Sequence, residues 1–356
     1  MSGTRRVNVA GLGLIGGSIA RGLVERGWEV GGDDLDPARV QRALELGILR
    51  HAGLFRDAEV TFVCTPVLTL VDEVRRILVA TDGLVTDVGS VKGALAAEID
   101  DPRFIGGHPM AGSELEGLDG ADGSMFGGAV WVLTPTPTTP DSTFAGVASV
   151  VAELGAEVVA LPADRHDQVV AVISHVPHLT AATLMGLAAD RAEEHAALLR
   201  LAAGGFRDMT RIASGHPAIW LDICAENRPA ILSALDDLID GLRAVRDVVD
   251  RDDRGELLHR LGRARQARAN LPIRGSRPAE LSEVRVPIPD RPGAAAEVFT
   301  LAAELGVNIE SFEVVHSAEG GRARGVAVVL VDAGAAELFR GGLSARGYRP
   351  AVQRLV

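Results

Sequence analysis

The stretch Val7-Asn8-Val9-Ala10-Gly11-Leu12-Gly13-Leu14-Ile15-Gly16 decides how the first part of this chain folds. Its apolar run predicts a strand over residues 6–10, and the glycines after it match the pattern G-x-G-x-x-G at the start of a predicted helix. Gly11 permits a tight turn, Gly13 lets the backbone approach a pyrophosphate, and Gly16 allows close packing of helix on strand. We expect a dinucleotide here, with its phosphates facing the free N–H groups around Leu14 and Ile15.

An acidic residue completes this pattern. Asp34 lies eighteen residues after Gly16, at the end of a predicted second strand over 28–32. A carboxylate there accepts hydrogen bonds from the adenosine ribose hydroxyls and, with Asp33 beside it, would repel the 2′-phosphate of NADP. We therefore expect NAD, although Arg39 nearby argues the other way. The alternative is that the glycines serve only a tight strand–helix turn.

Short apolar runs and helical patterns alternate up to about residue 161, which is typical of parallel βαβ units. Further strands are predicted over 59–64, 83–88, 103–105, 129–133 and 156–160. The first domain, over 1–163, is therefore expected to be an α/β Rossmann domain.

The strand signals stop after this point, and residues 164–270 show helical spacing throughout. This predicts an all-helical domain. Its longest apolar stripe must be covered, either inside its own domain or by a second subunit, and spacing does not separate the two. The stripe consists of Ile231, Leu235, Leu238, Leu242, Val245 and Val249.

Residues 271–281 have the prolines and the Gly-Ser pair of a linker, and a third domain follows over 282–356. Its pattern predicts the order βαββαβ, an α+β ferredoxin-like unit. The predicted strands are 283–288, 309–316, 325–331 and 351–355, and the predicted helices are 294–305 and 335–345.

Composition limits the partners. The chain has 356 residues, nearly half of them hydrophobic, and a net charge of -12, which disfavours binding to nucleic acid or to anionic membranes. It has no run of about 20 apolar residues typical of a membrane span, and its early glycines disfavour a signal peptide. Cys64 and Cys224 do not form a disulfide framework. We expect small-molecule partners and a cytoplasmic location.

Two predicted strand ends carry polar residues, and ligands bind outside such ends. Thr65 and Pro66 are expected near the nicotinamide. Ser90 either hydrogen-bonds cofactor or substrate, or caps a helix that starts at Val91.

The most informative segment is Gly106-Gly107-His108-Pro109-Met110-Ala111-Gly112-Ser113-Glu114. Glycines beside a histidine suggest an active-site loop with unusual backbone angles. A dehydrogenase needs a group that takes a hydroxyl proton while hydride leaves, and neutral histidine suits that role. His108 is our candidate base.

Together with two further motifs, this segment resembles the prephenate dehydrogenase family of tyrosine biosynthesis. The other motifs are Ser174-His175-Val176-Pro177-His178 and Gly205-Phe206-Arg207-Asp208-Met209-Thr210-Arg211-Ile212-Ala213. The resemblance covers roughly residues 7–268. It implies that the ring alcohol of prephenate loses hydride to NAD+ while the ring carboxylate leaves as CO2, and that the helical domain makes a homodimer.

The resemblance also implies roles for individual residues. His108 would draw off the hydroxyl proton with support from Ser90, and Arg211 would hold a substrate carboxylate in a bidentate fork. Glu114, beside Ser113 in the substrate loop, would join the ionic network near Arg211. His178 and Trp220 would line the side-chain end of the substrate. Arg207 stands where many family members have lysine, so the choice between prephenate and arogenate stays open.

Without the resemblance, these residues have plainer interpretations. Arg207, Asp208 and Arg211 would be a solvated network, and Trp220 would be part of the core. His175 and His178 have no evident third partner for a zinc ion, so no metal is expected. His166 and Asp167 are interpreted as structural.

The third domain separately resembles an ACT domain, a regulatory module that binds amino acids. Its ligand loops would contain Asp290, Pro292 and Gly293 on one side and Asn308 and Ile309 on the other. An aromatic amino acid is the expected effector, although a role in dimerisation alone is equally compatible with the sequence.

Three other functions remain open. One is arogenate dehydrogenase. Another is a β-hydroxyacid-type NAD dehydrogenase, which would favour a catalytic lysine on a helix, whereas lysine is scarce here and Lys92 lies on the wrong segment. The last is a noncatalytic sensor of NAD and an amino acid, which would not need the segment around His108.

Overall fold

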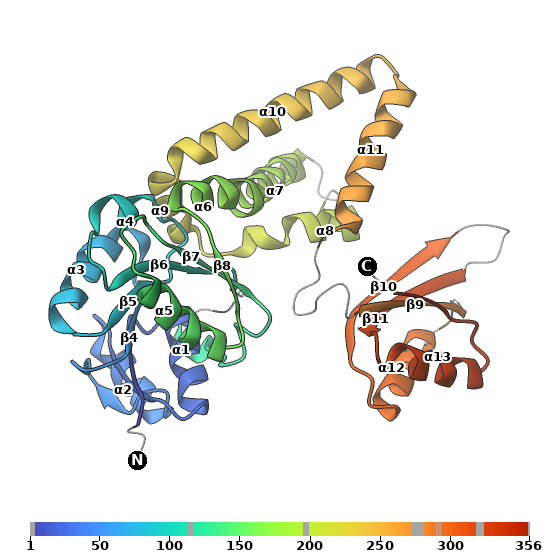
Figure 1. The fold of residues 1–356 in the computed structure, drawn as a ribbon. Helices are drawn as coiled ribbons and strands as arrows, with labels where there is room; N and C mark the ends of the chain where they lie inside the picture. The colour runs from blue at the N-terminus through green and yellow to red at the C-terminus, as the bar shows by residue number, and fades with distance from the viewer. Residues whose placement is uncertain are drawn as a thin grey trace. The chain divides into compact units, whose positions relative to one another are not determined.

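The computed structural model describes residues 4–112, 115, 117–194, 199–271, 281–289, 291, 293–317 and 324–354. The chain divides into two compact units, Met1–Arg260 and Leu261–Val356, and each is described by itself (Figure 1).

The first unit is built on an eight-stranded sheet with the order β3-β2-β1-β4-β5-β6-β7-β8. The strands β1 to β6 are parallel, and β1 lies between β2 and β4 because the chain winds outward from it in both directions. This confirms the predicted Rossmann architecture. The strands are β1 Arg6–Ala10, β2 Glu29–Asp33, β3 His51–Ala52, β4 Val60–Val63, β5 Leu84–Asp87, β6 Phe104–Pro109, β7 Val130–Thr134 and β8 Glu157–Ala160.

The expectation of a parallel sheet is wrong at its far edge. β7 runs antiparallel to β6, and β8 then runs parallel to β7. A parallel crossover needs a helix that carries the chain back along the sheet. The described part of 110–129 contains only the short 3-10 turn η2, Leu118–Gly120, so the chain returns antiparallel.

Helices cover both faces of the sheet (Figure 1). On one face α1 (Leu14–Glu25), α2 (Pro37–Glu45) and α5 (Asp141–Glu153) pack over a core that contains Phe62 and Trp131. On the other face α3 (Leu70–Ala80) and α4 (Gly93–Glu98) pack on a second apolar cluster. The carboxyl ends of the parallel strands stay uncovered by these helices.

The second part of this unit is helical, as predicted. Its first helix widens into a π turn directly before Pro177. Proline has no N–H for the ordinary helical hydrogen bond, which explains a local change of pitch there. The elements are α6 Ala163–Val170, the π turn η3 Ala171–His175, α7 Val176–Glu194, η4 Leu199–Leu201, α8 Gly204–Thr210, η5 Arg211–Ser214, α9 Pro217–Glu226, α10 Arg228–Asp250 and α11 Arg254–Ala269.

The continuous helical segment Ala163–Arg191 is long and apolar enough to cross a membrane by length and composition alone. This differs from the expectation that no such stretch exists. The same test is passed by core helices of soluble proteins, so the finding is weak evidence for a span. Here the segment carries the buried polar residues His166, Asp167, His175 and His178, which make hydrogen bonds or ring contacts to other elements.

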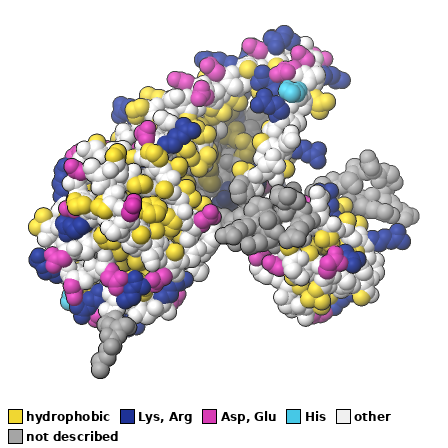
Figure 2. Space-filling view, in the orientation of Figure 1, with side chains coloured by type: hydrophobic (Ala, Val, Ile, Leu, Met, Phe, Trp, Pro, Cys, Tyr) yellow, Lys and Arg dark blue, Asp and Glu magenta, His cyan; other side chains and the backbone are white. Residues whose placement is uncertain are grey.

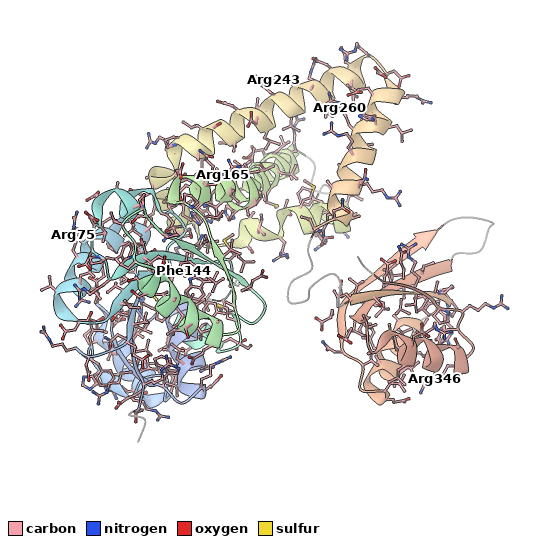
Figure 3. The ribbon with its side chains drawn as sticks, in the orientation of Figure 1. Arg75, Phe144, Arg165, Arg243, Arg260 and Arg346 are labelled. Carbon is pink, nitrogen blue, oxygen red and sulfur yellow. The ribbon has the colours of Figure 1, made fainter. Side chains whose placement is uncertain are left out.

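The apolar stripe of α10 is covered at one end and exposed at the other. Ile231 is buried and Leu235 packs against the same cluster, so this end is covered within its own unit. Further along, Leu242 and Val249 are 58% and 60% exposed. Hydrophobic side chains are visible on the surface of the helical part in Figure 2, while Arg243 projects from α10 in Figure 3. The exposed end of the stripe is the part available to a second subunit.

The second unit contains the predicted ferredoxin-like fold. Its four-stranded antiparallel sheet has the order β10-β11-β9-β12 and is covered by two helices, with Val286 and Phe339 in the core. Most of the predicted linker, 272–280, lies outside the described residues. The elements are β9 Leu281–Pro289, α12 Ala294–Glu304, β10 Ile309–Ser317, β11 Arg324–Asp332, α13 Ala336–Ala345 and β12 Ala351–Arg354.

The expected loop around His108 is instead largely a buried strand, since β6 includes Gly106, Gly107 and His108. Neither glycine has a positive φ. Their missing side chains serve close packing: a Cβ on Gly107 would lie 2.6 Å from the carbonyl oxygen of Asp87, and one on Gly106 would lie 2.4 Å from Oγ1 of Thr134. The glycines therefore hold the histidine in a crowded core rather than make it mobile.

This crowding predicts that Gly107→Ala lowers the free energy of unfolding by about 1–3 kcal/mol, the cost of forcing a methyl group into a packed core. Gly186→Ala on α7 is the matched control. Its Cβ would meet nothing within 4 Å, so the better helix propensity of alanine should raise stability by about 0.5–1 kcal/mol. Urea denaturation of both variants measures the difference; equal stabilities would contradict the packing role.

Candidate active site

The glycine turn has the geometry of a phosphate cradle. Gly11 has φ +97°, and a Cβ there would lie 2.6 Å from the carbonyl oxygen of Cys64. A Cβ on Gly16 would lie 1.9 Å from the carbonyl oxygen of Gly11, whereas one on Gly13 would face open space. α1 begins at Leu14 without a side-chain cap, so the N–H groups of Leu14 and Ile15 stay available to an anion.

Asp34 lies beside this turn. Its Oδ2 accepts a hydrogen bond from the N–H of Leu12 at 2.7 Å, and its Oδ1 accepts one from the N–H of Asp36 at 2.9 Å. Each carboxylate oxygen keeps a second lone pair for a ribose hydroxyl. Arg39 is 3.7 Å from the same carboxylate, and Asp33 is paired with Arg76 instead of facing the turn as a free charge.

The predicted residues at the next strand ends lie along the same edge of the sheet. Thr65 and Pro66 directly follow β4, and Oγ1 of Thr65 is buried with no hydrogen-bond partner among the described residues. Ser90 follows β5. It does not cap α4, which begins at Gly93 with Lys92 in the cap position, so the capping alternative is wrong. An orphaned hydroxyl beside a glycine turn fits a bound polar ligand.

His108 stands at the head of a buried hydrogen-bonded chain. Its Nδ1 is 2.8 Å from Nε2 of His166, and Nδ1 of His166 is 2.8 Å from Oδ1 of Asp167. The two oxygens of Asp167 also accept hydrogen bonds from the backbone N–H groups of Lys92 and Gly93, each at 2.9 Å. Three side chains and the start of α4 therefore form one connected network.

These contacts fix the proton positions. The Asp167 carboxylate only accepts hydrogen bonds, so Nδ1 of His166 donates to it, and with a single proton on that ring its Nε2 is the acceptor. Nδ1 of His108 must then be the donor, which leaves Nε2 of His108 with a free lone pair. Burial, above all, lowers the pKa of His108 well below 6.5, and His166 and Lys92 lower it further. His108 is thus a neutral proton acceptor around pH 7.

A second arm extends from Asp167 toward the helices. The side-chain amide of Asn227 donates to the backbone oxygen of Asp167 at 2.9 Å and to Nδ1 of His175 at 3.2 Å. The proton of neutral His175 is therefore on Nε2, which is buried and has no partner among the described residues. Burial lowers the pKa of His175 to about 4, although Asp167 opposes the shift.

The two aromatic candidates lie together. The rings of His178 and Trp220 are stacked with centroids 3.6 Å apart, and His175 stands edge-on to Trp220. Burial lowers the pKa of His178. Gly215 packs next to this stack, since a Cβ there would lie 3.5 Å from Cε1 of His178.

The arginine candidates lie on the exposed segment next to that stack. Arg207 is on α8, where its Nε donates to the backbone oxygen of Ala202 at 3.2 Å, and Arg211 begins η5, which packs on α7. No direct contact between either arginine and His108 is seen in the described part of the chain. Ser113 and Glu114 lie outside the described residues.

One apolar cluster joins the two halves of the site. Two residues at the carboxyl edge of the sheet pack with Ala171, Ile223 and Ile231 from the helical part: Val67, which begins the short 3-10 helix η1 (Val67–Thr69), and Val91, in the loop after β5. The helices are therefore seated on the edge of the sheet that carries the glycine turn and His108.

The residues missed by sequence reasoning are those that orient His108. His166 and Asp167 were interpreted as structural, and neither Asn227 nor the role of Asp87 and Lys92 was foreseen. A His-Asp pair before a helical domain is a weak signal, because its partner is 58 residues away in the chain.

Of the predicted regulatory residues, the structure describes Gly293, Asn308 and Ile309, and it places Gly293 and Asn308 at opposite ends of α12. Gly293, with φ +87°, caps the start of α12, while Asn308 follows its end and donates to Glu310 at 2.6 Å. Ile309 packs against the core of its unit. An eleven-residue helix separates the two positions by about 16 Å. Asp290 and Pro292 lie outside the described residues.

Metal-binding geometry is not found in the part of the chain that the structure describes: no three His, Cys, Asp or Glu side chains gather as ligands. His175 and His178 are instead occupied by Asn227 and Trp220, respectively.

Comparison with known proteins identifies the family. The family model described as prephenate dehydrogenase, nucleotide-binding domain, matches residues 19–160, and the one described as prephenate dehydrogenase, dimerization domain, matches 162–263. A prephenate dehydrogenase of Bacillus subtilis is 33% identical over 87% of this chain and 88% of its own length. The chain belongs to the prephenate dehydrogenase family.

Other members of the family differ in their named substrates. A cyclohexadienyl dehydrogenase of Zymomonas mobilis is 32% identical over 75% of this chain and 96% of its own. The prephenate dehydrogenase of A. aeolicus, solved with hydroxyphenyl propionate and NAD+, has a TM-score of 0.71 at 28% identity, covering 76% of this chain and 99% of that one. The arogenate dehydrogenase of Synechocystis has a TM-score of 0.65 at 32% identity, covering 74% and 99%.

The lowered pKa values of His108 and His175 predict acid sensitivity. Unfolded histidine takes up a proton near pH 6.5, whereas these folded histidines do so only at lower pH. The free energy of unfolding should therefore fall as the pH decreases from 6.5 to 5, by up to about 2 kcal/mol for each histidine.

Urea denaturation at several pH values measures this slope. His175→Gln removes one of the protons and should flatten the slope, whereas the same substitution at exposed His259 on α11 should preserve it. A wild-type slope in His175→Gln would show that His175 is not held neutral by the fold.

Proposed function

We propose that this chain is an NAD-dependent prephenate dehydrogenase, which converts prephenate to 4-hydroxyphenylpyruvate by oxidative decarboxylation. The observation that carries the proposal is the free lone pair on Nε2 of His108, fixed by His166 and Asp167 on the sheet edge that also holds the glycine turn. A pure sensor of NAD would not need a neutral base there.

The residues around the turn fit NAD. The cradle of Gly11, Gly13 and Gly16 would receive the pyrophosphate, and Asp34 the adenosine ribose. The hydroxyl of Thr65, which has no partner in the described part of the chain, and the neighbouring Pro66 would face the nicotinamide end. NAD+, when bound, supplies the acceptor for the ring hydride.

The side chains of the protein take up the hydroxyl proton of the substrate and bind its carboxylates. His108 accepts the proton of the ring hydroxyl through Nε2, with Ser90 as a second contact to the same oxygen. The hydride and CO2 leave the ring as it becomes aromatic. Arg211 binds a substrate carboxylate in a bidentate fork; Ser113 would contact the substrate, and Glu114 would belong to the ionic network near Arg211.

The far end of the substrate would meet the His178–Trp220 stack. His175 offers its buried Nε2–H, which has no partner among the described residues, to the substrate in that region. Arg207 adds a second cation on the segment of Arg211. Two positive charges favour the keto acid prephenate over arogenate, whose amino group is itself positive.

The exposed apolar end of α10 supports a proposal about the oligomeric state. We propose a homodimer through the helical part, which would cover Leu242, Val245 and Val249. Both cysteines are free, and we place the enzyme in the cytoplasm. We also propose domains over 1–163, 164–270 and 282–356 with a linker over 271–281, the last domain being an ACT domain.

Steady-state kinetics on prephenate and arogenate with NAD+ and NADP+ test the activity. We expect NADH formation with prephenate, and a loss of about 10²- to 10⁴-fold in kcat for His108→Asn, with the affinity for NAD+ retained. No turnover of either substrate, or a His108→Asn variant as fast as wild type, would overturn the proposal.

Regulation gives a separate prediction. Tyrosine or phenylalanine should shift the activity or the melting temperature of the full-length enzyme, and Asn308→Ala should weaken that response. Asn270→Ala, at the end of α11, is the matched control. An effector response that is identical in wild type and Asn308→Ala would exclude this loop as the effector site.

A further inference from the structure

The chain contains a single lysine. Lys92 is the only one among 36 Lys and Arg residues, and it is completely buried in the first unit. The other 35 of these residues are arginines. A buried ammonium is costly unless it is paired, so the position calls for a specific explanation.

Lys92 and Asp87 form a buried ion pair around one peptide. Nζ of Lys92 bonds to Oδ2 of Asp87 and donates to the backbone oxygen of Gly107 at 2.9 Å. Oδ1 of Asp87 accepts from the N–H of Gly107 at 3.0 Å, and its Oδ2 also accepts from Gly89. The pair therefore holds both polar backbone groups of the residue that precedes His108.

The Lys92–Asp87 pair provides hydrogen-bond partners for β6 beyond the point where its backbone pairing with β5 ends. The backbone pairing of β5 with β6 runs through Val85–Phe104 and Thr86–Ile105. Beyond Ile105 the side chains of Asp87 and Lys92 provide the partners that a strand would otherwise provide. The end of β6 can thus separate from β5 without unsatisfied backbone groups in the core.

The backbone of Lys92 reaches the other end of the histidine chain. Its N–H and that of Gly93 donate to the carboxylate of Asp167, which orients His166. One residue therefore contacts the strand that carries His108 through its side chain and the anchor of His166 through its backbone.

The space around the ammonium suits a point charge. A Cβ on Gly106 would lie 3.2 Å from Cδ of Lys92, and one on Gly89 would lie 3.6 Å from its Nζ. A guanidinium is planar and larger, and it cannot occupy the same point between Asp87 and Gly107. This explains a lysine in a chain that otherwise uses arginine.

We propose that Lys92, paired with Asp87, is a positioning residue of the reaction: it fixes the depth and orientation of the His108 imidazole relative to His166. The inference rests on the proposed function, because Lys92 is said to align the residue that acts there as the base, His108. Lys92 itself is buried behind β6 and acts through His108.

The test is the double variant Asp87→Asn/Lys92→Met, which removes both buried charges together. We expect kcat to fall about tenfold to a hundredfold, the usual consequence of a base displaced by a fraction of an ångström to one ångström. KM and the affinity for NAD+ should change less than kcat, because the glycine turn, Asp34 and Arg211 lie on other segments of the chain. The acid limb of the pH profile should also move, because burial, the contact with His166 and the nearby Lys92 charge all contribute to the lowered pKa of His108.

The matched control is Arg56→Met/Asp82→Asn, which removes an ion pair of the same unit whose side chains are 73% and 63% exposed. It should leave kcat and the pH profile unchanged. Lys92→Arg is a second variant that retains the charge, and it should lose at least about tenfold in kcat because its charge centre cannot reach Gly107 from the same place.

An activity-independent readout separates this inference from the proposed function. Protein labelled with ¹³C at histidine Cε1 reports the titration of His108 by NMR, with His108→Asn for assignment. A wild-type enzyme that turns over neither substrate refutes the function, while the NMR shift still tests the positioning. A folded double variant, or a folded Lys92→Arg, with wild-type kcat and wild-type His108 titration would overturn the inference.

Discussion

The buried carboxylate of Asp167 is the contact on which the rest of the site depends. It lies on the first helix of the helical part, and it accepts hydrogen bonds from the start of α4 in the nucleotide-binding part. Through His166 it sets the tautomer of His108, and its own backbone oxygen is bound by Asn227. The apolar cluster around Val91 and Ile231 provides the area for this junction, whereas Asp167 provides its register. An apolar contact alone would tolerate sliding, but a carboxylate with three donors does not.

The first part of the fold could be predicted well because its signals are local. The glycines at 11, 13 and 16 act within one turn, and each has the steric role that its spacing indicates. Alternating apolar runs likewise predicted seven of the strands and the βαββαβ order of the last unit. The direction of β7 was missed, because direction depends on what the connection 110–129 can span rather than on the strand itself.

The site was predicted only in part, for the opposite reason. His108 was found, but its glycines were interpreted as sources of mobility, since a sequence does not show that Asp87 and Thr134 crowd them. His166, Asp167 and Lys92 carry no periodic or motif signal of their own. Their roles arise from contacts across many residues of sequence, and only the folded chain brings them together. The stripe on α10 was ambiguous from spacing, and the structure shows it divided between a covered and an exposed end.

The histidine chain also has a consequence for energetics. Because Nδ1 of His108 is bonded to His166, the ring cannot flip without breaking this buried hydrogen bond, and it cannot change tautomer unless His166, which is bonded to Asp167, changes as well. The dipoles around the reacting hydroxyl are consequently aligned during folding and not when substrate arrives, so little solvent or side-chain reorganisation remains for the chemical step. The conformational entropy of the base is lost once, during folding, rather than in every turnover.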